Sequence, residues 1–202
     1  LFLIQRRHRV IRAILDQAFP DGCRDLRLLE IGCGNGQWLA EFQMFGLRAG
    51  NLAGIDLDET RATEARERIV GADIRVGDAA ALPWPDAAFD VVFQSTVFSS
   101  VPDLAARLRI AAEMKRVCRP TGFILWYDFT VNSPHNSQVQ GIPAPEVGRL
   151  FAPWTCAFRT VTLAPPLARR IIPWSWSLAE DLETFLPFLR THLIACITPR
   201  SP

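Results

Sequence analysis

The sequence lacks the features of a membrane-spanning or nucleic-acid-binding protein. No apolar run approaches the roughly 20 residues that a helix needs to cross a bilayer. The 22 basic and 21 acidic residues leave a net charge of +1, which gives a polyanion no electrostatic reason to bind. With 202 residues, of which 49% are apolar and 21% charged, the composition is that of an ordinary globular protein. We therefore expect a single domain over residues 1–202 and no nucleic-acid partner.

Cysteine and histidine are few and scattered. The five cysteines form no CxxC pair, and the three histidines are far apart in the chain. This pattern predicts no metal site. The number of cysteines is odd and no secretory signal precedes them, so we expect reduced, mostly buried thiols and a cytoplasmic location.

The order of apolar and polar segments predicts an α/β fold. Strand-like and helix-like segments alternate through the first two-thirds of the chain, which is typical of a parallel sheet with helices on both faces. We expect a doubly wound, mostly parallel, seven-stranded sheet. The predicted strands are 26–31, 52–55, 74–76, 91–93, 123–127, 157–163 and 193–197, and the clearest predicted helices are 3–19, 37–45, 59–69 and 104–118.

A glycine-rich turn follows the first predicted strand. Residues 28–36 read Leu-Leu-Glu-Ile-Gly-Cys-Gly-Asn-Gly, so an apolar run precedes three glycines at alternate positions. Glycine permits a sharp backbone turn and the close approach of a ligand. The free N–H groups of the following helix then face that ligand. The turn predicts a site for a small molecule with polar groups.

Three further polar features stand at the ends of later strands. Asp56 ends the second strand, Asp78 ends the third, and the buried run 89–95 ends in Gln94 and Ser95. Ligands of doubly wound sheets bind beyond the carboxyl ends of the strands. We therefore expect these residues to meet the glycine turn at one edge of the sheet.

In order and spacing, residues 26–127 resemble the class I S-adenosylmethionine-dependent methyltransferases. The likeness continues through 113–122, although Thr121 replaces the first of two glycines that are usual in that turn. The resemblance implies the Rossmann-like methyltransferase fold and S-adenosylmethionine as the cofactor. Residues 128–141 and the segments near 164 and 189–192 are similar to a bacterial subgroup often found beside genes for surface polysaccharides or secondary metabolites.

The resemblance also implies which residues would hold the methionine portion of the cofactor. The glycine turn would pass beneath that portion, and Glu30 would support the turn or reach the amino group, directly or through water. The turn residues concerned are Gly32, Cys33, Gly34 and Gly36.

A second group of residues would hold the adenosine portion. Asp56 would accept hydrogen bonds from both ribose hydroxyls, a task suited to one carboxylate with two oxygens. Asp78 would accept a hydrogen bond from the adenine amine, and the N–H of Ala79 would face the ring. Leu57 and Leu82 would enclose the two apolar faces of the adenine.

Simpler and competing roles stay open for these residues. The glycines would also suit a plain strand-to-helix turn, and an aspartate before a helix is often an N-cap, as we expect for Asp58. Asp78 is open to the same capping or turn-forming role. A nicotinamide oxidoreductase is the nearest competitor, but its GxGxxG fingerprint requires glycine where this chain has Gln37. A third alternative is a non-catalytic domain that retains the fold.

The residues that act on the methyl acceptor are harder to predict. In-line transfer from a sulfonium gains from a dry, aligned site, and it needs a general base only when the acceptor holds its proton. Gln94 and Ser95 would lie near the sulfur. Tyr127, Asp128 and His135 are the candidate catalytic residues. A histidine in a loop is most often an exposed residue, and Asp128 could equally tie down the loop through backbone N–H groups. We expect a small-molecule or glycan-precursor acceptor, methylated on oxygen or alternatively on nitrogen.

Three segments outside the motifs complete the predicted domain. Residues 1–25 would form a helix that covers the cofactor side, 128–148 a long loop over the carboxyl edge, and 165–189 a cap on the acceptor side. The stretch 171–188 is unusually apolar. A helix that covers the acceptor pocket explains it most simply, and the alternative is a surface that approaches a membrane, lipid-linked substrates or a partner subunit in a dimer.

Overall fold

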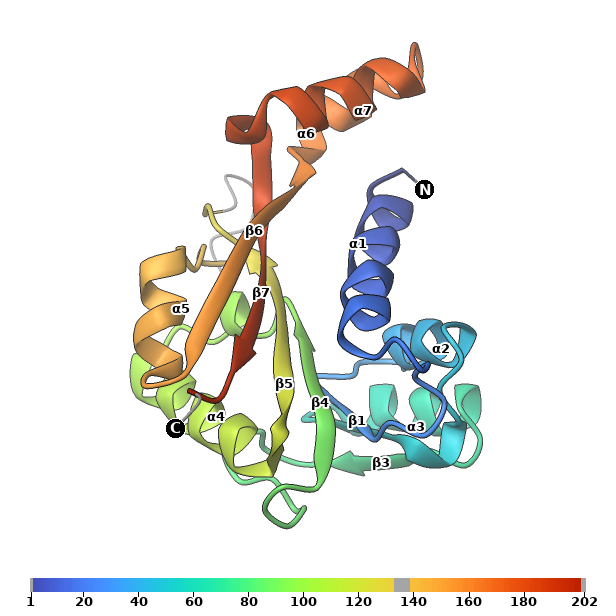
Figure 1. The fold of residues 1–202 in the computed structure, drawn as a ribbon, viewed down its shortest axis with the longest axis vertical. Coiled ribbons are helices and arrows are strands. Elements are labelled where there is room, and N and C mark those ends of the chain that lie inside the picture. Colours follow the sequence, from blue (N-terminus) through green and yellow to red (C-terminus); the bar gives the residue numbers. More distant parts are fainter. Residues whose placement is uncertain (1, 133–138, 201–202) are drawn as a thin grey trace.

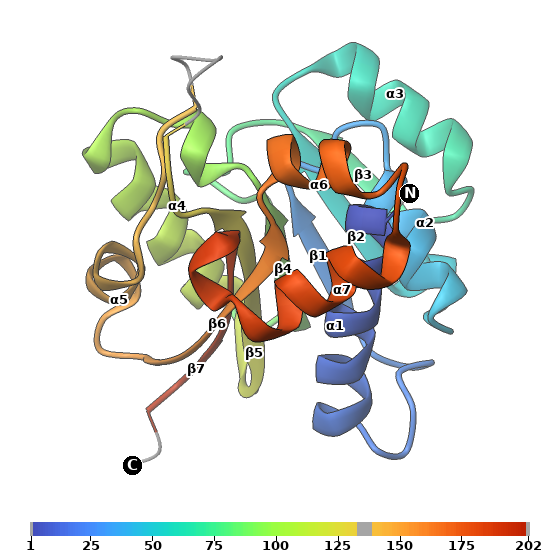
Figure 2. The same ribbon diagram turned by 90° about the horizontal axis from the view of Figure 1, so that it is seen from above.

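The computed structural model describes residues 2–132 and 139–200, which form one seven-stranded sheet with helices on both faces (Figure 1 and Figure 2). The order across the sheet is β3-β2-β1-β4-β5-β7-β6. Neighbouring strands from β3 to β5 are parallel, whereas β7 runs antiparallel to both β5 and β6. The predicted fold class is confirmed. The strands are β1 (Leu28–Ile31), β2 (Leu52–Asp56), β3 (Asp73–Val76), β4 (Phe89–Ser95), β5 (Cys118–Phe129), β6 (Thr155–Leu163) and β7 (Arg190–Thr198).

Helices cover the two faces of the sheet unequally. Three of them, α1 (Phe2–Ala18), α2 (Gln37–Met44) and α3 (Glu59–Arg68), pack on one face, and α4 (Leu104–Val117) and α5 (Ala144–Phe151) pack on the other. The remaining helices, α6 (Pro165–Ile171) and α7 (Trp176–Phe185), stand at the end of the β6–β7 hairpin (Figure 1). Short 3-10 turns lie at Ala49–Asn51, Phe98–Ser100 and Pro187–Leu189.

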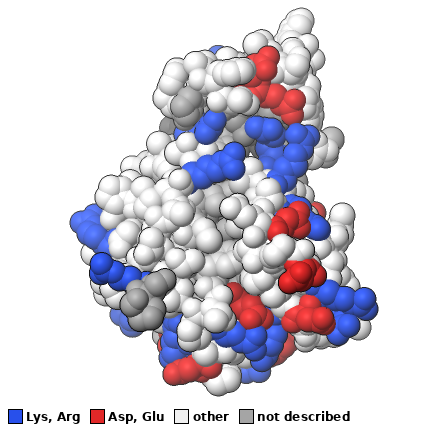
Figure 3. Space-filling model, in the orientation of Figure 1, with Lys and Arg blue, Asp and Glu red and all other residues white. Residues whose placement is uncertain are grey.

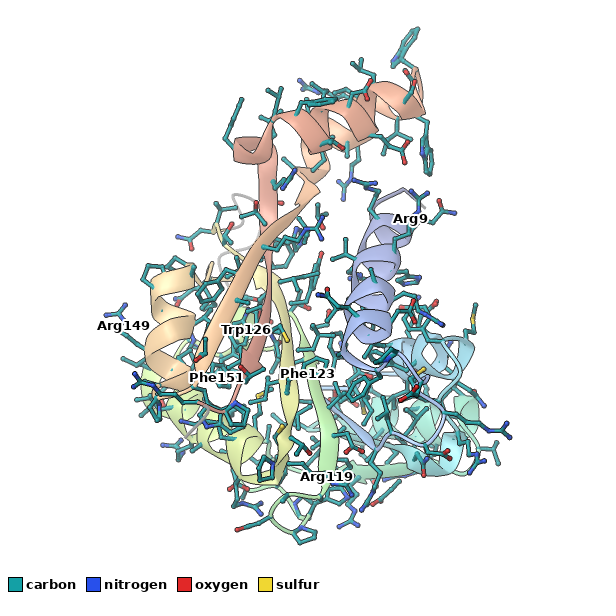
Figure 4. All side chains as sticks on the ribbon, viewed as in Figure 1. Arg9, Arg119, Phe123, Trp126, Arg149 and Phe151 are labelled. Atoms are coloured by element: carbon teal, nitrogen blue, oxygen red, sulfur yellow. The ribbon has the colours of Figure 1, made fainter. Side chains whose placement is uncertain are left out.

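The two cores follow from the alternation of side chains along the central strands. Phe93 and Leu125 belong to the core beneath α1, α2 and α3, and Val92 and Trp126 belong to the core beneath α4 and α5. Trp126 meets Phe151 of α5 in a T-shaped contact with the ring centroids 5.7 Å apart (Figure 4). Because both faces of the central strands are covered, these strands are almost continuously apolar.

The structure corrects the loop predicted over residues 128–148. β5 continues through Asp128 and Phe129, which pair with Leu193 and His192 of β7, and α5 begins at Ala144. The strand is longer than predicted because its last backbone groups find ladder partners on a distant strand. Helix α5 begins at Ala144, within the predicted loop, and the proline at position 145 is compatible with it because proline is well tolerated in the first turn of a helix.

Residues 165–189, which we name the cap after its predicted role, fold as α6, α7 and the 3-10 turn that follows them. The cap has a small apolar core of its own around Leu163 and Ala168. Glu180 of α7 forms an ion pair with Arg9 of α1 at 3.4 Å, so the cap reaches the amino-terminal helix. None of the described helices is both long and apolar enough to cross a bilayer.

Candidate functional site

The glycine turn between β1 and α2 has a left-handed backbone at three positions. The angle φ is +63° at Gly32, +52° at Gly34 and +75° at Gly36, a region that residues with a side chain rarely adopt. A Cβ atom at Gly32 would lie 2.5 Å from Cγ2 of Val97, and one at Gly36 would lie 3.1 Å from Ala65. The turn therefore needs glycine for its conformation and for the close approach of its neighbours.

Asp56 at the end of β2 holds this turn from the neighbouring strand. Its Oδ2 accepts a hydrogen bond from the N–H of Gly34 at 2.8 Å, and its Oδ1 accepts one from the N–H of Asp58 at 3.0 Å. Asp58 caps α3 by accepting from the N–H groups of Thr60 and Arg61, so the predicted N-cap is confirmed. Because each carboxylate oxygen has two lone pairs, Asp56 keeps the capacity to accept hydrogen bonds from a ligand.

Asp78 lies just beyond the end of β3. Its Oδ1 accepts a hydrogen bond from the N–H of Ala80 at 2.8 Å, which is the turn-forming role that the sequence left open. Asp78 also lines the same cavity as Asp56. The same residue thus shapes the turn and borders the cavity.

The strand ends surround a cavity of about 540 Å³, a volume suited to a cofactor or small substrate. Six residues that the sequence predicted for the cofactor line it, and the other lining residues come largely from 96–101 and α4, which no local motif marks. The predicted lining residues are Gly32, Asp56, Leu57, Asp78, Ala79 and Ser95, and the others are Ile31, Ile55, Arg61, Gly77, Thr96, Val97, Ser100, Val101, Ala106 and Ile110.

Three residues that the sequence predicted to contact the ligand are buried and do not line the cavity. Leu82 is buried in the core beneath α4 and α5, so Leu57, and not Leu82, is placed to contact a ligand. Gln94 is fully buried; its Nε2 donates to the carbonyl of Tyr127, and its Oε1 accepts from the N–H of Val97. Cys33 packs against Gly54 of β2, and burial raises the pKa of its thiol to about 12.

Glu30 of β1 and Arg7 of α1 each carry a buried polar atom that has no partner among the described residues. Glu30 is buried, and among the described residues nothing hydrogen-bonds its Oε2. Burial, together with the charge of Asp56, raises the pKa of Glu30 well above its ordinary value. Arg7 of α1 also has a buried, unpartnered Nε, and its guanidinium lies 4.5 Å from the centroid of the Trp38 ring. An amino acid's ammonium and carboxylate groups would satisfy these two side chains.

Tyr127 lies near the carboxyl end of β5, next to polar side chains from distant segments. It is buried, its hydroxyl shares a hydrogen bond with Thr162 Oγ1 at 3.3 Å, and Arg7 lies 5.2 Å from its ring centroid. His192 of β7 stacks on the same ring with the centroids 5.0 Å apart. Burial and the charge of Arg7 lower the pKa of His192 to about 4, so this imidazole is neutral at physiological pH. The sequence did not single out Arg7, Thr162 or His192 as site residues.

The other two candidate catalytic residues differ in their placement. Asp128 is completely buried, and its carboxylate accepts hydrogen bonds from the N–H groups of Ser99 and Phe129 at 3.1 and 2.8 Å. It therefore acts as the backbone tie that the sequence allowed. Burial raises the pKa of Asp128 to about 6. His135 lies outside the described residues. Within those residues, no group of three His, Cys, Asp or Glu side chains is arranged to hold a metal.

A doubly wound sheet with a glycine turn after β1 and an acidic residue after β2 is the arrangement of α/β enzymes that bind a nucleoside cofactor. Comparison with known proteins narrows this class. Residues 29–126 match the family model described as a methyltransferase domain. A solved SAM-dependent methyltransferase from Archaeoglobus fulgidus has the same fold, with a TM-score of 0.66, 14% identity, and 96% of each chain covered.

Two curated relatives are similar over the same region. The chain is 34% identical to 27-O-demethylrifamycin SV methyltransferase of Amycolatopsis mediterranei, over 61% of this chain and 46% of that protein. It is 39% identical to nocamycin O-methyltransferase of Saccharothrix syringae, over 57% of this chain and 41% of that protein. The chain thus matches less than half the length of these relatives. The family model and these relatives together support a class I S-adenosylmethionine-dependent methyltransferase, with S-adenosylmethionine as the cofactor.

Proposed function

We propose that the protein transfers a methyl group from S-adenosylmethionine to a small-molecule or glycan-precursor acceptor, on oxygen or alternatively on nitrogen. The observation that carries this proposal is the cavity at the strand ends, where Gly32, Asp56 and Asp78 converge from three separate strands. The names of the rifamycin and nocamycin relatives support a small molecule and an oxygen acceptor. The nicotinamide alternative has less support because Gln37 begins α2 where a dinucleotide fingerprint requires glycine.

Residues at one end of the site would bind the adenosine portion of the cofactor, and residues at the other end would bind its methionine portion. Asp56 would accept the ribose hydroxyls with the lone pairs that its backbone bonds leave free. Asp78 and Ala79 would meet the adenine edge, and Leu57, which is otherwise 75% exposed, would cover an apolar face of the ring. At the other end, Glu30 would accept the ammonium group beside the glycine turn.

Arg7 extends the proposed set of cofactor residues beyond the sequence motifs. Its buried Nε has no partner among the described residues, and its positive charge lowers the pKa of Glu30 in opposition to the burial that raises it. Arginine is suited to a carboxylate because its guanidinium donates hydrogen bonds in a planar fork. We therefore assign the carboxylate of the methionine portion to Arg7 and the ammonium to Glu30.

At the acceptor side, methyl transfer would proceed by in-line displacement, for which the bound cofactor supplies an electrophilic methyl group on a sulfonium. Burial keeps Tyr127 protonated because it raises the pKa of the phenol, so this side chain would donate or accept a hydrogen bond without ionising. Asp128 would act as a positioning residue through Ser99. His135 stays a candidate base from the sequence.

The cap offers two surfaces with different proposed roles. Its inner residues form the small core around Ala168, which supports a cover for the acceptor side. Its outer surface exposes Trp174 by 89%, Phe185 by 74% and Phe188 by 77%. Figure 3 shows basic side chains just below the cap. We propose that this outer surface contacts a lipid-linked acceptor at a membrane surface or a partner subunit.

Calorimetry of the full chain with S-adenosylmethionine, S-adenosylhomocysteine and NAD tests the proposed function. We expect both adenosyl ligands to bind and NAD to give no heat. Binding of NAD alone would overturn the proposal. Binding of the adenosyl ligands without methyl transfer to a panel of hydroxylated and amino acceptors, followed with a labelled methyl group, would favour the non-catalytic alternative.

A further inference from the structure

A buried arginine stands behind one wall of the cofactor cavity. The wall is the segment 96–101 between β4 and α4, and Thr96, Val97, Ser100 and Val101 of this segment line the cavity. Arg107, one turn into α4, is only 5% exposed. Burial of a guanidinium is costly unless its donors are satisfied, so the contacts of this side chain reveal what it does.

The guanidinium of Arg107 donates to three segments of the chain. Its Nε donates to the carbonyl of Val101 at 2.6 Å, its Nη1 to Oε1 of Glu146 at 2.7 Å, and its Nη2 to Oε1 of Gln140 at 3.3 Å. Val101 belongs to the cavity wall, Glu146 to α5, and Gln140 to the residues just before α5. One planar group therefore joins the cofactor cavity to two elements outside it.

Gln140 is linked to the wall a second time through its backbone. Its N–H donates to the carbonyl of Ser99 at 2.9 Å. Residues 99 and 101 of the wall are thus both connected to Gln140, one directly and one through Arg107. A shift of the segment around Gln140 would move the wall with it.

The wall has little support from its own backbone conformation. Thr96 has φ of +59°, which is strained for a β-branched residue. Besides the 3-10 turn at Phe98–Ser100 and the backbone bonds of Thr96 N–H to the Tyr127 carbonyl and of Gln140 N–H to the Ser99 carbonyl, side chains hold the segment. Gln94 accepts from Val97 N–H, and Asp128 accepts from Ser99 N–H. Gln94 and Asp128 belong to central strands. Arg107 ties the far end of the wall, and it alone of these three side chains also reaches α5 and Gln140.

We propose that Arg107 is a positioning residue that sets the cavity wall for cofactor binding and couples it to Gln140 and to α5. The inference rests on the proposed use of this cavity by S-adenosylmethionine. Lysine would keep the charge, but its three donors share one nitrogen, whereas the bonds of Arg107 leave from three separate nitrogens of a planar group. The identity of the residue, and not only its charge, is therefore the property to test.

The test measures S-adenosylhomocysteine affinity by calorimetry on the full chain, with Arg107→Lys as the main variant. We expect about tenfold weaker binding, as for the loss of one charge-assisted hydrogen bond at the wall. Hydrogen exchange of the amides in 96–101 is expected to accelerate in the same variant. Arg149→Lys is the matched control, because Arg149 lies on α5 beside Glu146 and points into solvent (Figure 4); it should change neither measurement.

A second variant separates positioning from general stability. Gln140→Ala alters an exposed side chain, so we expect it to leave the fold intact and to weaken S-adenosylhomocysteine binding about threefold. Combined with Arg107→Lys, its effect should be less than additive because the two residues act on one wall. The inference is overturned if Gln140→Ala and a folded Arg107→Lys both bind like the unmodified protein. If the unmodified protein itself does not bind the ligand, the proposed function fails instead.

Discussion

The carboxylate of Asp56 accepts a hydrogen bond from the backbone N–H of Gly34 at 2.8 Å. This contact joins the end of β2 to the middle of the glycine turn that follows β1, across 22 positions of sequence. The residue proposed to hold the ribose thus also fixes the turn proposed to hold the methionine portion. Changes at Asp56 should therefore affect both halves of the cofactor site.

Asp56→Ala is expected to weaken S-adenosylhomocysteine binding by at least about 1 kcal/mol, because a charge-assisted pair of hydrogen bonds is lost. Asp58→Ala is the matched control two residues away. It removes the N-cap of α3 and should lower the free energy of unfolding by about 1 kcal/mol with no change in affinity. Calorimetry and chemical denaturation measure the two quantities, and an unchanged affinity in Asp56→Ala would refute the ribose assignment.

Arg7→Met tests the assignment of the methionine portion. This change is expected to weaken the binding of S-adenosylhomocysteine about tenfold, because the carboxylate of the ligand loses its guanidinium partner. Binding of 5′-methylthioadenosine, which has the nucleoside and lacks the amino acid, should stay the same. Glu30→Gln should likewise weaken the binding of S-adenosylhomocysteine and leave that of 5′-methylthioadenosine unchanged, because Glu30 is proposed to bind the ammonium group. Equal losses for the two ligands would show instead that Arg7 only supports the fold.

Gly32→Ala is expected to destabilise the protein by more than about 1 kcal/mol, since alanine would need a left-handed backbone. Its Cβ would also lie 2.5 Å from Val97. Gly148→Ala is the opposite case, because a Cβ there meets no atom within 4 Å and the site is inside α5; it should gain up to about 1 kcal/mol. Thermal and urea unfolding compare the two variants. Val97→Ala added to Gly32→Ala should recover the steric part of the loss.

Asp128 should give the stability a defined dependence on pH. Burial raises its pKa to about 6 from an ordinary value of 3.8, so between these values the folded state binds more protons than the unfolded state. The contribution of this carboxyl to stability is then complete below about pH 4 and is lost as the pH rises through about 6. Urea unfolding from pH 4.5 to 7.5 should show this slope in the difference between the unmodified protein and Asp128→Asn. A flat difference would contradict the raised pKa.

The outer surface of the cap gives a prediction that is independent of the cofactor. If it contacts lipid, the protein should co-sediment with liposomes of mixed neutral and anionic lipids, and serine at Trp174, Phe185 and Phe188 should abolish this. The three side chains are at least 74% exposed, so the replacements should leave unfolding unchanged. Absence of sedimentation would exclude the membrane role, and a change in oligomeric state in the triple variant would support the subunit contact.

The sequence predicted all seven strands because their apolar runs and intervening helices are local patterns. Its errors have a common physical origin. β5 extends to Phe129 because β7 offers a ladder partner there, and no pattern near residue 129 shows which strand will pair with it. Leu82 and Gln94 have the right residue types for a cofactor site, but contacts with Glu113 and Val97 direct them into the interior.

The cofactor edge was determined by the sequence itself, since each of its features is a short strand-and-turn unit whose glycines and carboxylates need only local geometry. Gly32, Asp56 and Asp78 meet because parallel strands bring their carboxyl ends to one edge. The tertiary structure alone decided the remainder of the site. Arg7 reaches Tyr127, and Arg107 reaches Glu146, across 120 and 39 positions. Such contacts depend on how the helices pack on the sheet, and packing between distant segments leaves no periodic signal in the chain.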